Sequence, residues 1–349
     1  MAILDIFNGD AFKTTTLIAA LENAEYVPGR LGQLNLFTST PVRTDSVAVE
    51  VRDNGSLKLI PTSERGAPLP QTSGGKRRMR SFQTTRIGIG DRIMASELAF
   101  VRQFGEEQAV EQVQAEVARR WTGPTGLIGS VDLTLEHMRL GAIQGKMLDS
   151  DGTVLEDWVT AFDKPGSTPT TIPTVAFNFS TLANGELREK LVKLKRDLAR
   201  ASDGVWTPQT KIHVLCGDNF FDKLAKNAEV REYYKNRLNA ALVVEGYDAF
   251  DTIEIDGWVF ENYRGTDDNS TVAIGTDEAH AFPVNTNGAF LHAKAPGESF
   301  ADLGMLGKDL YPLITPDLSG HNRYVDLEVI AYPLFVATRP KMLRKFTSA

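Results

Sequence analysis

Few side chains in this sequence have the type and spacing that metal binding or covalent catalysis requires. The chain contains one cysteine and five histidines: Cys216, His137, His213, His280, His292 and His321. No two histidines have the four-residue spacing by which one helix face can hold zinc. A single cysteine excludes an intramolecular disulfide and a thiolate metal cluster. Because Cys216 ends an apolar run, we interpret it as a small buried residue; a cysteine nucleophile paired with a distant histidine stays open as an alternative.

Two short motifs resemble ligand-binding loops but lack essential positions. Gly141–Lys146 reads Gly-Ala-Ile-Gln-Gly-Lys, which is one residue short of a phosphate-binding loop and is followed by Met147 where a hydroxyl is needed. Asp149–Gly152 begins like a calcium loop, but the later ligand positions are wrong, and an Asp-Gly turn between strands is favoured. The nucleophile motif Gly-x-Ser-x-Gly is absent. We therefore predict no catalytic residue, no cofactor and no metal ligand.

The composition is that of a globular protein that can build a substantial core. The 349 residues are 42% hydrophobic and 24% charged, with a formal net charge of −7. This mild acidity argues against general adhesion to nucleic acid. The sequence has neither a signal peptide pattern at its start nor an apolar run long enough to span a bilayer. We expect a soluble protein that is not exported and does not enter a membrane.

Residues 46–92 have an unusual pattern for a compact domain. Val47, Val49 and Val51 alternate with polar residues before an Asp-Asn-Gly turn signal, and apolar residues resume at 57–60, which predicts a β-hairpin over 47–60. Residues 61–75 are rich in proline and glycine, and a basic run at 76–80 leads into a second extended stretch that reaches residue 89. Such a long irregular segment is either a binding element or a floppy surface loop.

Helical periodicity marks the middle of the chain. A short helix is expected at 11–24, and Ser96 could cap a helix whose apolar stripe ends at Trp121. A second helix is predicted from Ile128 to Ile143, followed by a hairpin that turns at 150–152.

The remainder of the chain mixes helices and strands. We expect a helix at 182–201, a strand at 212–216 followed by a helix capped by Asp218, and a tight hairpin at Asp256-Gly257. A short strand at 272–275 and a closing strand at 327–335 follow. A basic tail ends the chain, with Arg339, Lys341, Arg344 and Lys345.

Three stretches of the second half carry a resemblance to a known family. Residues 268–276 (Asp-Asn-Ser-Thr-Val-Ala-Ile-Gly-Thr) look like its polar turn, strand and glycine, and the Asp256-Gly257 hairpin lies at the usual distance before them. Residues 328–340 are similar to its closing strand around a Tyr-Pro-Leu core. With the order of elements along the chain, these stretches resemble the lambda-type major capsid proteins of tailed bacteriophages (phage major capsid protein E), which have the α+β Hong Kong 97-like capsid fold.

The resemblance implies an assignment of parts: an N-terminal arm at 1–45, an extended β-loop at 46–92, a peripheral domain at 93–180 with a spine helix at about 128–143, an axial domain at 181–309, and a C-terminal return to the peripheral domain at 310–349. It also implies a subunit that assembles into pentamers and hexamers of an icosahedral head. That head encloses double-stranded DNA without sequence-specific binding. Assembly in the host bacterial cytoplasm with a scaffold, a portal and possibly a decoration protein is implied too, as is localisation in the virion.

The residues of the loop support self-assembly independently of the resemblance. Two or three exposed strands bury too little surface to form a domain, so their edges need a partner, and a neighbouring chain could supply one. The basic run would then meet acidic surface on that neighbour. The candidate interface residues are Val47, Val49, Val51, Leu57, Leu59, Lys76, Arg77, Arg78, Arg80 and Phe82.

Two other functions stay open. An encapsulin-like compartment shell would have the same fold and enclose cargo enzymes instead of a genome. A cytosolic α/β enzyme of the hydrolase type, with residues 181–309 as its catalytic domain, would require a deep polar cleft near His213 or Asp218.

Overall fold

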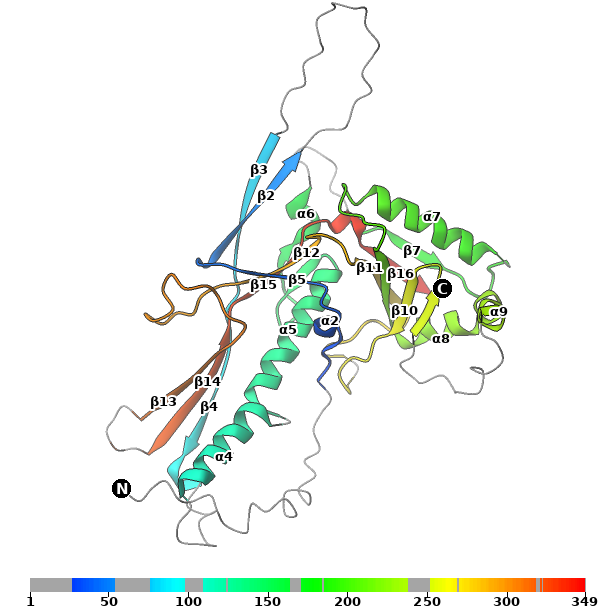
Figure 1. Ribbon diagram of the computed structural model, residues 1–349. Helices are drawn as coiled ribbons and strands as arrows, with labels where there is room; N and C mark the ends of the chain where they lie inside the picture. The colour runs from blue at the N-terminus through cyan, green and yellow to red at the C-terminus, as the bar shows by residue number, and fades with distance from the viewer. Residues whose placement is uncertain are drawn as a thin grey trace, which may run out of the picture.

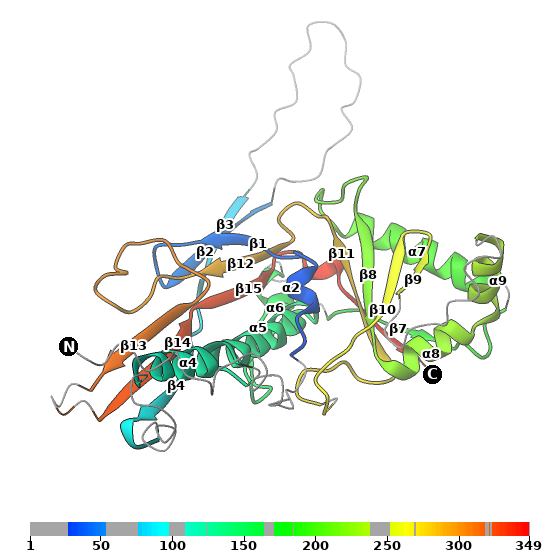
Figure 2. The same ribbon diagram turned by 60° about the horizontal axis from the view of Figure 1, so that its bottom comes forward.

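The fold was established from a computed structural model. It describes residues 27–53, 76–97, 109–123, 125–163, 171–183, 185–237, 252–268, 270–317, 321 and 323–348. Helices and strands are mixed as α+β, in two halves that lie side by side in Figures 1 and 2. One half is built around a long helical rod and the other around a six-stranded sheet.

Helices α4 (Ala109–Thr122) and α5 (Leu127–Ile143) run end to end as the rod of the first half (Figure 1). The buried face of α5 includes Val131, Leu135, Met138 and Ala142, so the helix predicted at 128–143 is confirmed. Two three-stranded sheets pack along it. One has the order β1 (Thr38–Pro41), β12 (Phe290–Lys294), β15 (Pro333–Ala337); the other has the order β13 (Tyr311–Pro316), β14 (Tyr324–Ala331), β4 (Ile87–Met94).

A small hairpin follows the rod. Gly145 has a φ of 77°, which favours glycine, and it ends the helical segment before strands β5 (Lys146–Leu148) and β6 (Val154–Asp157). The two strands pair as predicted, with the turn at 150–152. The Asp157 carboxylate accepts the N–H groups of Val159 and Thr160 and caps α6 (Trp158–Phe162).

The six-stranded sheet has the order β7 (Thr174–Phe177), β16 (Arg344–Ser348), β11 (Glu278–Val284), β8 (Lys211–Cys216), β10 (Trp258–Asn262), β9 (Thr252–Ile255). The predicted hairpin at Asp256-Gly257 joins β9 to β10, with φ values of 50° and 84°. Helices α7 (Glu186–Arg200), α8 (Asp218–Lys226) and α9 (Ala228–Arg237) accompany this sheet. The helix predicted at 182–201 is confirmed as α7, which buries Leu187, Leu191, Leu194 and Leu198.

The two halves meet at α2 (Arg30–Gln33), a single helical turn with buried carboxylates on either side. Glu136 of α5 is fully buried and accepts the N–H of Leu31 at 2.7 Å. From β10, Glu261 accepts two hydrogen bonds from the Arg30 guanidinium, at 2.5 and 2.9 Å, and lies 2.9 Å from His213 of β8. The turn therefore ties the rod to the six-stranded sheet.

The last residues do not form a basic tail, contrary to expectation. After β15 and a short 3-10 helix, η3 (Pro340–Met342), the chain enters the six-stranded sheet as β16, between β7 and β11. Arg344 is buried, and its guanidinium donates to the carbonyls of Lys341 and Leu343, both at 2.7 Å. The charges of this segment masked a strand whose Phe346 belongs to the core.

The prediction of a hairpin over 47–60 gave the first strand the wrong partner. Strand β2 (Ser46–Asp53) pairs antiparallel with β3 (Lys76–Gln83), from Ser46 opposite Gln83 to Asp53 opposite Lys76. The turn signal at 53–55 reflects only local sequence. The observed pairing is favoured because it places the valines of β2 on the same face as Phe82, which belongs to the core. Residues 54–75, including the predicted second strand of the hairpin, lie outside the described part of the chain.

Three smaller predictions also differ from the structure. Residues 272–275 form no strand, because Val272 bonds back to Thr266 while its side chain fills the core. Gly217, not Asp218, caps α8, and a Cβ there would lie 2.2 Å from the carbonyl oxygen of Gly275. Ser96 lies within a helical turn at 95–97 instead of preceding it. The helix predicted at 11–24 is outside the described residues.

Candidate subunit-contact surface

Strands β2 and β3 form a two-stranded ribbon at the edge of the first half (Figure 1). Residues directly opposite one another share a face, so Val47 lies with Phe82, and Val49 with Arg80. We call this the inner face, because Phe82 is 5% exposed. The outer face carries Met79, which is 74% exposed.

The inner face anchors the ribbon to its own subunit. The Phe82 ring packs edge-on against Trp158 with ring centroids 5.2 Å apart, and Phe162 lies 5.9 Å away. Val47 and Val49 are partly buried against the same core. An aromatic cluster of this kind contributes both buried area and directional ring contacts, so the base of the ribbon has a fixed position.

The predicted interface residues thus fall into three groups. Val47, Val49, Arg78, Arg80 and Phe82 lie on the inner face, where Arg78 donates to the carbonyl of Asp163 at 3.2 Å. For Val51, Lys76 and Arg77 the structure gives strand positions only. Leu57 and Leu59 are outside the described residues.

Of the predicted set, only Arg77 has an outer-face position in the register of the ribbon. The exposed residues of this face, which the sequence analysis did not name, are Ala48, Glu50, Met79, Ser81 and Gln83. The signal was present, because strand side chains alternate between faces and a buried Phe82 requires residues 79, 81 and 83 to point outward. The predicted residues were chosen mainly as valine, leucine or basic side chains, and this criterion did not select the outer-face residues Met79, Ser81 and Gln83.

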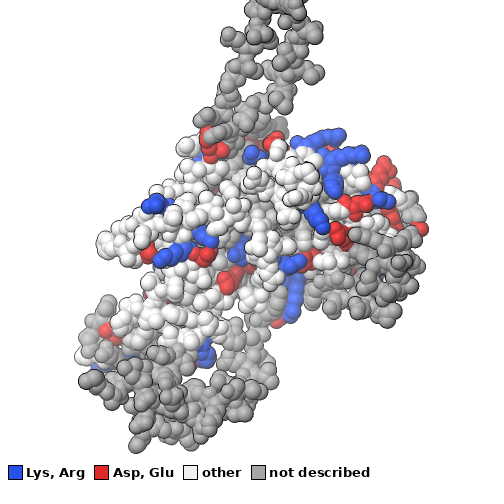
Figure 3. All heavy atoms as spheres, in the orientation of Figure 1, with Lys and Arg blue, Asp and Glu red and all other residues white. Residues whose placement is uncertain are grey.

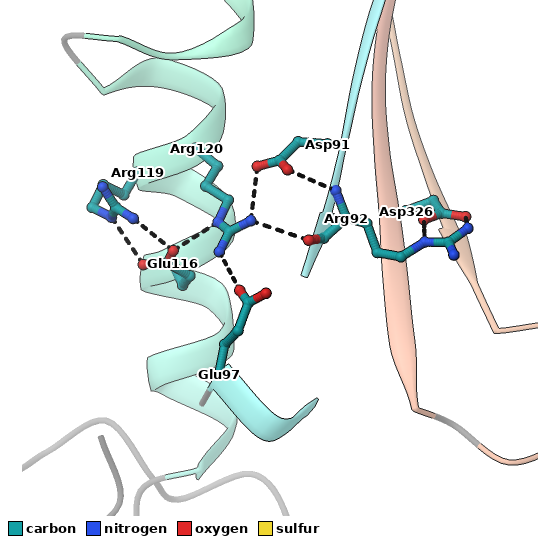
Figure 4. A network of polar contacts seen from close by, with 7 residues as sticks. All are labelled: Asp91, Arg92, Glu97, Glu116, Arg119, Arg120 and Asp326. Atoms are coloured by element: carbon teal, nitrogen blue, oxygen red, sulfur yellow. Dashed lines mark hydrogen bonds and ion pairs between the residues drawn. The ribbon is translucent and has the colours of Figure 1, made fainter. Parts of the chain in front are cut away.

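A polar clamp holds β4, the strand that follows the ribbon, against helix α4 (Figure 4). The guanidinium of Arg120 is its centre and contacts three carboxylates: Glu97 at 2.5 Å, Glu116 at 2.7 Å and Asp91 at 2.8 Å. On the other side of β4, Arg92 donates to both carboxylate oxygens of Asp326 on β14, at 2.6 and 2.9 Å. The clamp therefore links the rod, β4 and β14.

The charges of the clamp perturb one another. Hydrogen bonds from Arg119, together with those from Arg120, hold the pKa of Glu116 down, from 4.5 to about 2, against the opposing effect of burial. Burial alone would lower the pKa of Arg120, but the carboxylates of Glu116, Asp91 and Glu97 raise it. Glu116 and Arg120 therefore both stay charged near neutral pH, where their ion pair is formed.

Of the residues that could carry chemistry, His213, His280 and Cys216 are buried, His137 and His292 are partly buried, and His321 is exposed. His213 is 6% exposed beside Glu261, and burial lowers the pKa values of His280 and His292 to about 4. Burial also raises the pKa of the Cys216 thiol, which disfavours the thiolate needed for nucleophilic attack. Within the described ranges, no group of histidine, cysteine and acidic residues is arranged to hold a metal ion. Among the same residues, no helix is long and apolar enough to cross a membrane.

Comparisons with known proteins identify the family. The model of the family described as phage major capsid protein E matches residues 13–348. The major capsid protein of Salmonella phage Felix O1 is 24% identical over 345 residues, which cover 90% of each chain.

Solved structures with a similar fold are phage capsid proteins. The capsid protein of cyanophage Pam1 aligns with a TM-score of 0.57 at 11% identity, over 93% of this chain and 94% of the other. That of cyanophage P-SCSP1u aligns with a TM-score of 0.51 at 11% identity, over 90% and 86%. The predicted α+β Hong Kong 97-like fold is thus confirmed. Since the family model spans nearly its whole length, the chain belongs to the family of phage major capsid protein E.

Proposed function

We propose that this chain is the shell subunit of a tailed-phage head, which assembles into pentamers and hexamers of an icosahedral capsid around double-stranded DNA. Membership of the family supports the general role. In this proposal the subunit assembles in the host cytoplasm with a scaffold, a portal and a possible decoration protein, and then remains in the virion. The shell encloses the DNA without binding it tightly, and the net charge of −7 on each subunit is in keeping with weak attraction to phosphate.

The observation that carries the proposal is the two-faced ribbon of β2 and β3. Its inner face is secured by Phe82, while its outer face exposes Met79. Two strands alone are marginally stable in water, so an element of this kind is expected to gain a partner. We assign the ribbon to the extended loop, and its outer face to contact with a neighbouring copy.

The sheets suggest how the chain divides into domains. We assign α4, α5, β5, β6 and both three-stranded sheets to the peripheral domain, and the six-stranded sheet with α7–α9 to the axial domain. Compared with the boundaries expected from the sequence, β1, β12 and most of β4 move to the peripheral domain, and β7 and β16 move to the axial domain. The axial domain is therefore built from two separate stretches of chain, one from β7 to β11 and the other β16.

The subunit acts without catalysis in this proposal. A hydrolase would need a deep polar cleft near His213 or Asp218. The His213 side chain is 6% exposed and bonded to Glu261, whereas Asp218 is exposed at the start of α8 and accepts a hydrogen bond from Asn262. The protonated state favoured for Cys216 argues against a cysteine nucleophile as well. An encapsulin-like compartment would have a similar fold, but the family model and the Felix O1 relative both favour a phage head.

Shortening the ribbon tests this function. Residues 55–74 can be replaced by Asn-Gly, which closes a short turn between Asp53 and Lys76, the last pair of the ribbon. The shortened subunit keeps the Phe82 anchor, so we expect it to fold, with a thermal midpoint within a few degrees of the wild type. Electron microscopy should show shells for the wild type, expressed with its neighbouring genes, and none for the shortened chain.

A matched control uses a turn away from the ribbon. The β5–β6 hairpin turns at Ser150-Asp151-Gly152, and Asp151→Asn keeps both its length and its shape, so this variant should form shells. Normal shells from the shortened chain would refute the role of the extended loop. A wild-type chain that remains a compact monomer or dimer under all conditions would refute the capsid function itself.

A further inference from the structure

The loop between β12 and β13 exposes more apolar side chains than any other short segment among the described residues. Phe300 is 96% exposed, Leu303 69%, Met305 58% and Leu306 50%. Together these side chains expose an area on the order of the largest apolar patch of a typical monomer, about 300–600 Å². In Figure 3 the left-hand edge of the body, where this loop lies in Figure 1, is a mostly uncharged prominence.

The loop is held in place from within. The N–H of Asp302 donates to the carbonyl of Ser299, and that of Met305 to the carbonyl of Asp302, both at 3.0 Å. Gly307 packs so closely on β12 that a Cβ would lie 2.0 Å from the carbonyl oxygen of Lys294. The exposed side chains therefore stand on a fixed backbone, and a partner that bound them would lose little entropy in ordering the loop.

The loop and the ribbon share the same base. The Arg43 guanidinium donates to the carbonyl of Gly304 at 3.0 Å, and the N–H of Gly307 donates to the carbonyl of Val42 at 3.0 Å. At the start of the ribbon, the carbonyl of Asp45 accepts the N–H of Thr84 at 2.9 Å. The loop surface is therefore continuous with the ribbon to which we assign contact with a neighbouring copy, and Figure 2 shows both on the same side of the body.

The charges around the loop indicate the chemistry of its partner. Lys308 lies 3.8 Å from Asp302, Lys294 pairs with Asp309, and Arg86 lies 3.2 Å from Glu298. These three cations face carboxylates of their own chain, and Arg43 donates to the carbonyl of Gly304, so the described loop offers little of the clustered positive charge that binding to nucleic acid requires. An apolar centre with a charge-balanced rim is typical of a protein–protein contact.

We propose that the loop at 299–306, with Phe300 at its centre, is a hydrophobic contact to a second copy of this chain in the assembled shell. The inference rests on the proposed capsid function, because the contact is assigned to neighbouring copies in the assembled shell. The contact is heterologous, so the apolar loop of one subunit meets a different surface of the next. It adds a second attachment point to the one that the ribbon provides.

Two variants at one position test the contact without disturbing the fold. Phe300→Asp places a charge at the centre of the apolar surface, and Phe300→Leu keeps the surface apolar. We expect the concentration of subunit needed for assembly to rise roughly tenfold or more for the aspartate variant, as for the loss of a central interface residue, and to change little for the leucine variant. Thermal unfolding of the unassembled subunits should match the wild type in both, because residue 300 is 96% exposed.

A photoreactive phenylalanine analogue at position 300 identifies the occupant. Irradiation of assembled particles should link this position to a second copy of the chain, and mass spectrometry of the linked peptides should locate the surface that receives it. A link to another protein or to DNA, or no link between chains, would overturn the proposal. If wild-type shells form and Phe300→Asp shells form equally well, this inference fails while the capsid function stands; if wild-type shells never form, the capsid function fails.

Discussion

The junction at α2 and the ribbon of β2 and β3 are close in sequence but differ in how their side chains are bonded and buried within the subunit. At the junction, the buried carboxylate of Glu136 accepts the N–H groups of Leu31 and Gly32 and a hydrogen bond from Arg139. In the ribbon, one face is packed into the core through Phe82 and the other exposes Met79. The polar groups of the junction are hydrogen-bonded within one subunit, whereas only one of the two faces of the ribbon is packed against its own subunit.

The difference shows where this chain depends on folding and where it depends on assembly. A buried carboxylate is stable only if every hydrogen bond is made, so the junction must form when the subunit folds. An exposed methionine has no such requirement, and in the proposed shell its burial would come later, from a neighbouring chain. Substitutions at the junction should therefore change the stability of the subunit, and substitutions on the outer face should change assembly alone.

The largest loss of stability is expected for Glu136→Ala. It leaves two backbone N–H groups and the Arg139 guanidinium without their acceptor in a buried site, which costs about 4 kcal/mol of the free energy of unfolding. Urea unfolding of the unassembled subunit measures this loss. Glu189→Ala on the exposed face of α7 is the matched control and should stay within about 0.5 kcal/mol of the wild type. Equal stabilities for the two variants would show that the junction does not hold the halves together.

Phe82→Ala should have the next largest effect, because it removes the anchor on the inner face. Deletion of a buried aromatic ring costs about 3 kcal/mol, and here it also removes the edge-on contact to Trp158. The free energy of unfolding should fall by that amount in urea. Phe82→Leu, which keeps most of the apolar volume, should lose less than half as much. A negligible loss for Phe82→Ala would mean that the ribbon is not anchored and that its two faces do not differ.

The sequence was sufficient for elements whose signals are local and insufficient for those set by distant partners. The leucine spacing of α7 and the Asp256-Gly257 turn each specify their structure within a few residues. The partner of β2 is more than 20 residues away along the chain, and β16 enters a sheet whose other strands come much earlier. No local pattern encodes such pairings, since several strands of suitable alternation compete for each place.

The same reasoning explains what the sequence revealed of the functional surfaces. The composition of residues 46–92 led to the prediction of a contact loop, but which face of the ribbon points outward depends on the packing of Phe82 against Trp158. Glu136 offered a weak signal, because it is an acidic residue beside the apolar stripe of a buried helix. Its partners at Leu31 and Gly32 lie about a hundred residues earlier and only the fold brings them together.

A smaller effect, dependent on pH, is expected at the clamp that follows the ribbon. The hydrogen bonds from Arg119 and Arg120 depress the pKa of Glu116 from 4.5 to about 2. A carboxyl group with a depressed pKa in the folded state stabilises the protein above its unfolded pKa, and this contribution disappears as the pH falls through the folded value. Glu116→Gln should therefore be less stable than the wild type near neutral pH, by less than about 1 kcal/mol because the clamp is partly exposed.

Urea unfolding at a series of pH values measures this difference. It should shrink steadily between pH 4.5 and about 2, where Glu116 of the wild type becomes protonated. Glu189→Gln, at an exposed position of α7, provides the comparison for loss of a carboxylate outside the clamp. A difference that stayed constant through this window would show that the contacts of Glu116 do not depend on its charge.

The smallest effect on stability, and the sharpest test of the comparison, is expected for Met79→Asp. The side chain is 74% exposed, so the free energy of unfolding should stay within about 0.5 kcal/mol of the wild type. Met79 faces outward from the same strand that Phe82 anchors inward, three residues away. If the outer face contacts a neighbour, the buried aspartate must be desolvated there, and shells should fail to form although the subunit is fully folded. Met79→Leu should assemble normally. Shells from Met79→Asp that match the wild type in yield and in stability would mean that the outer face stays in solvent, and the contrast between a face completed by folding and a face completed by assembly would then be wrong.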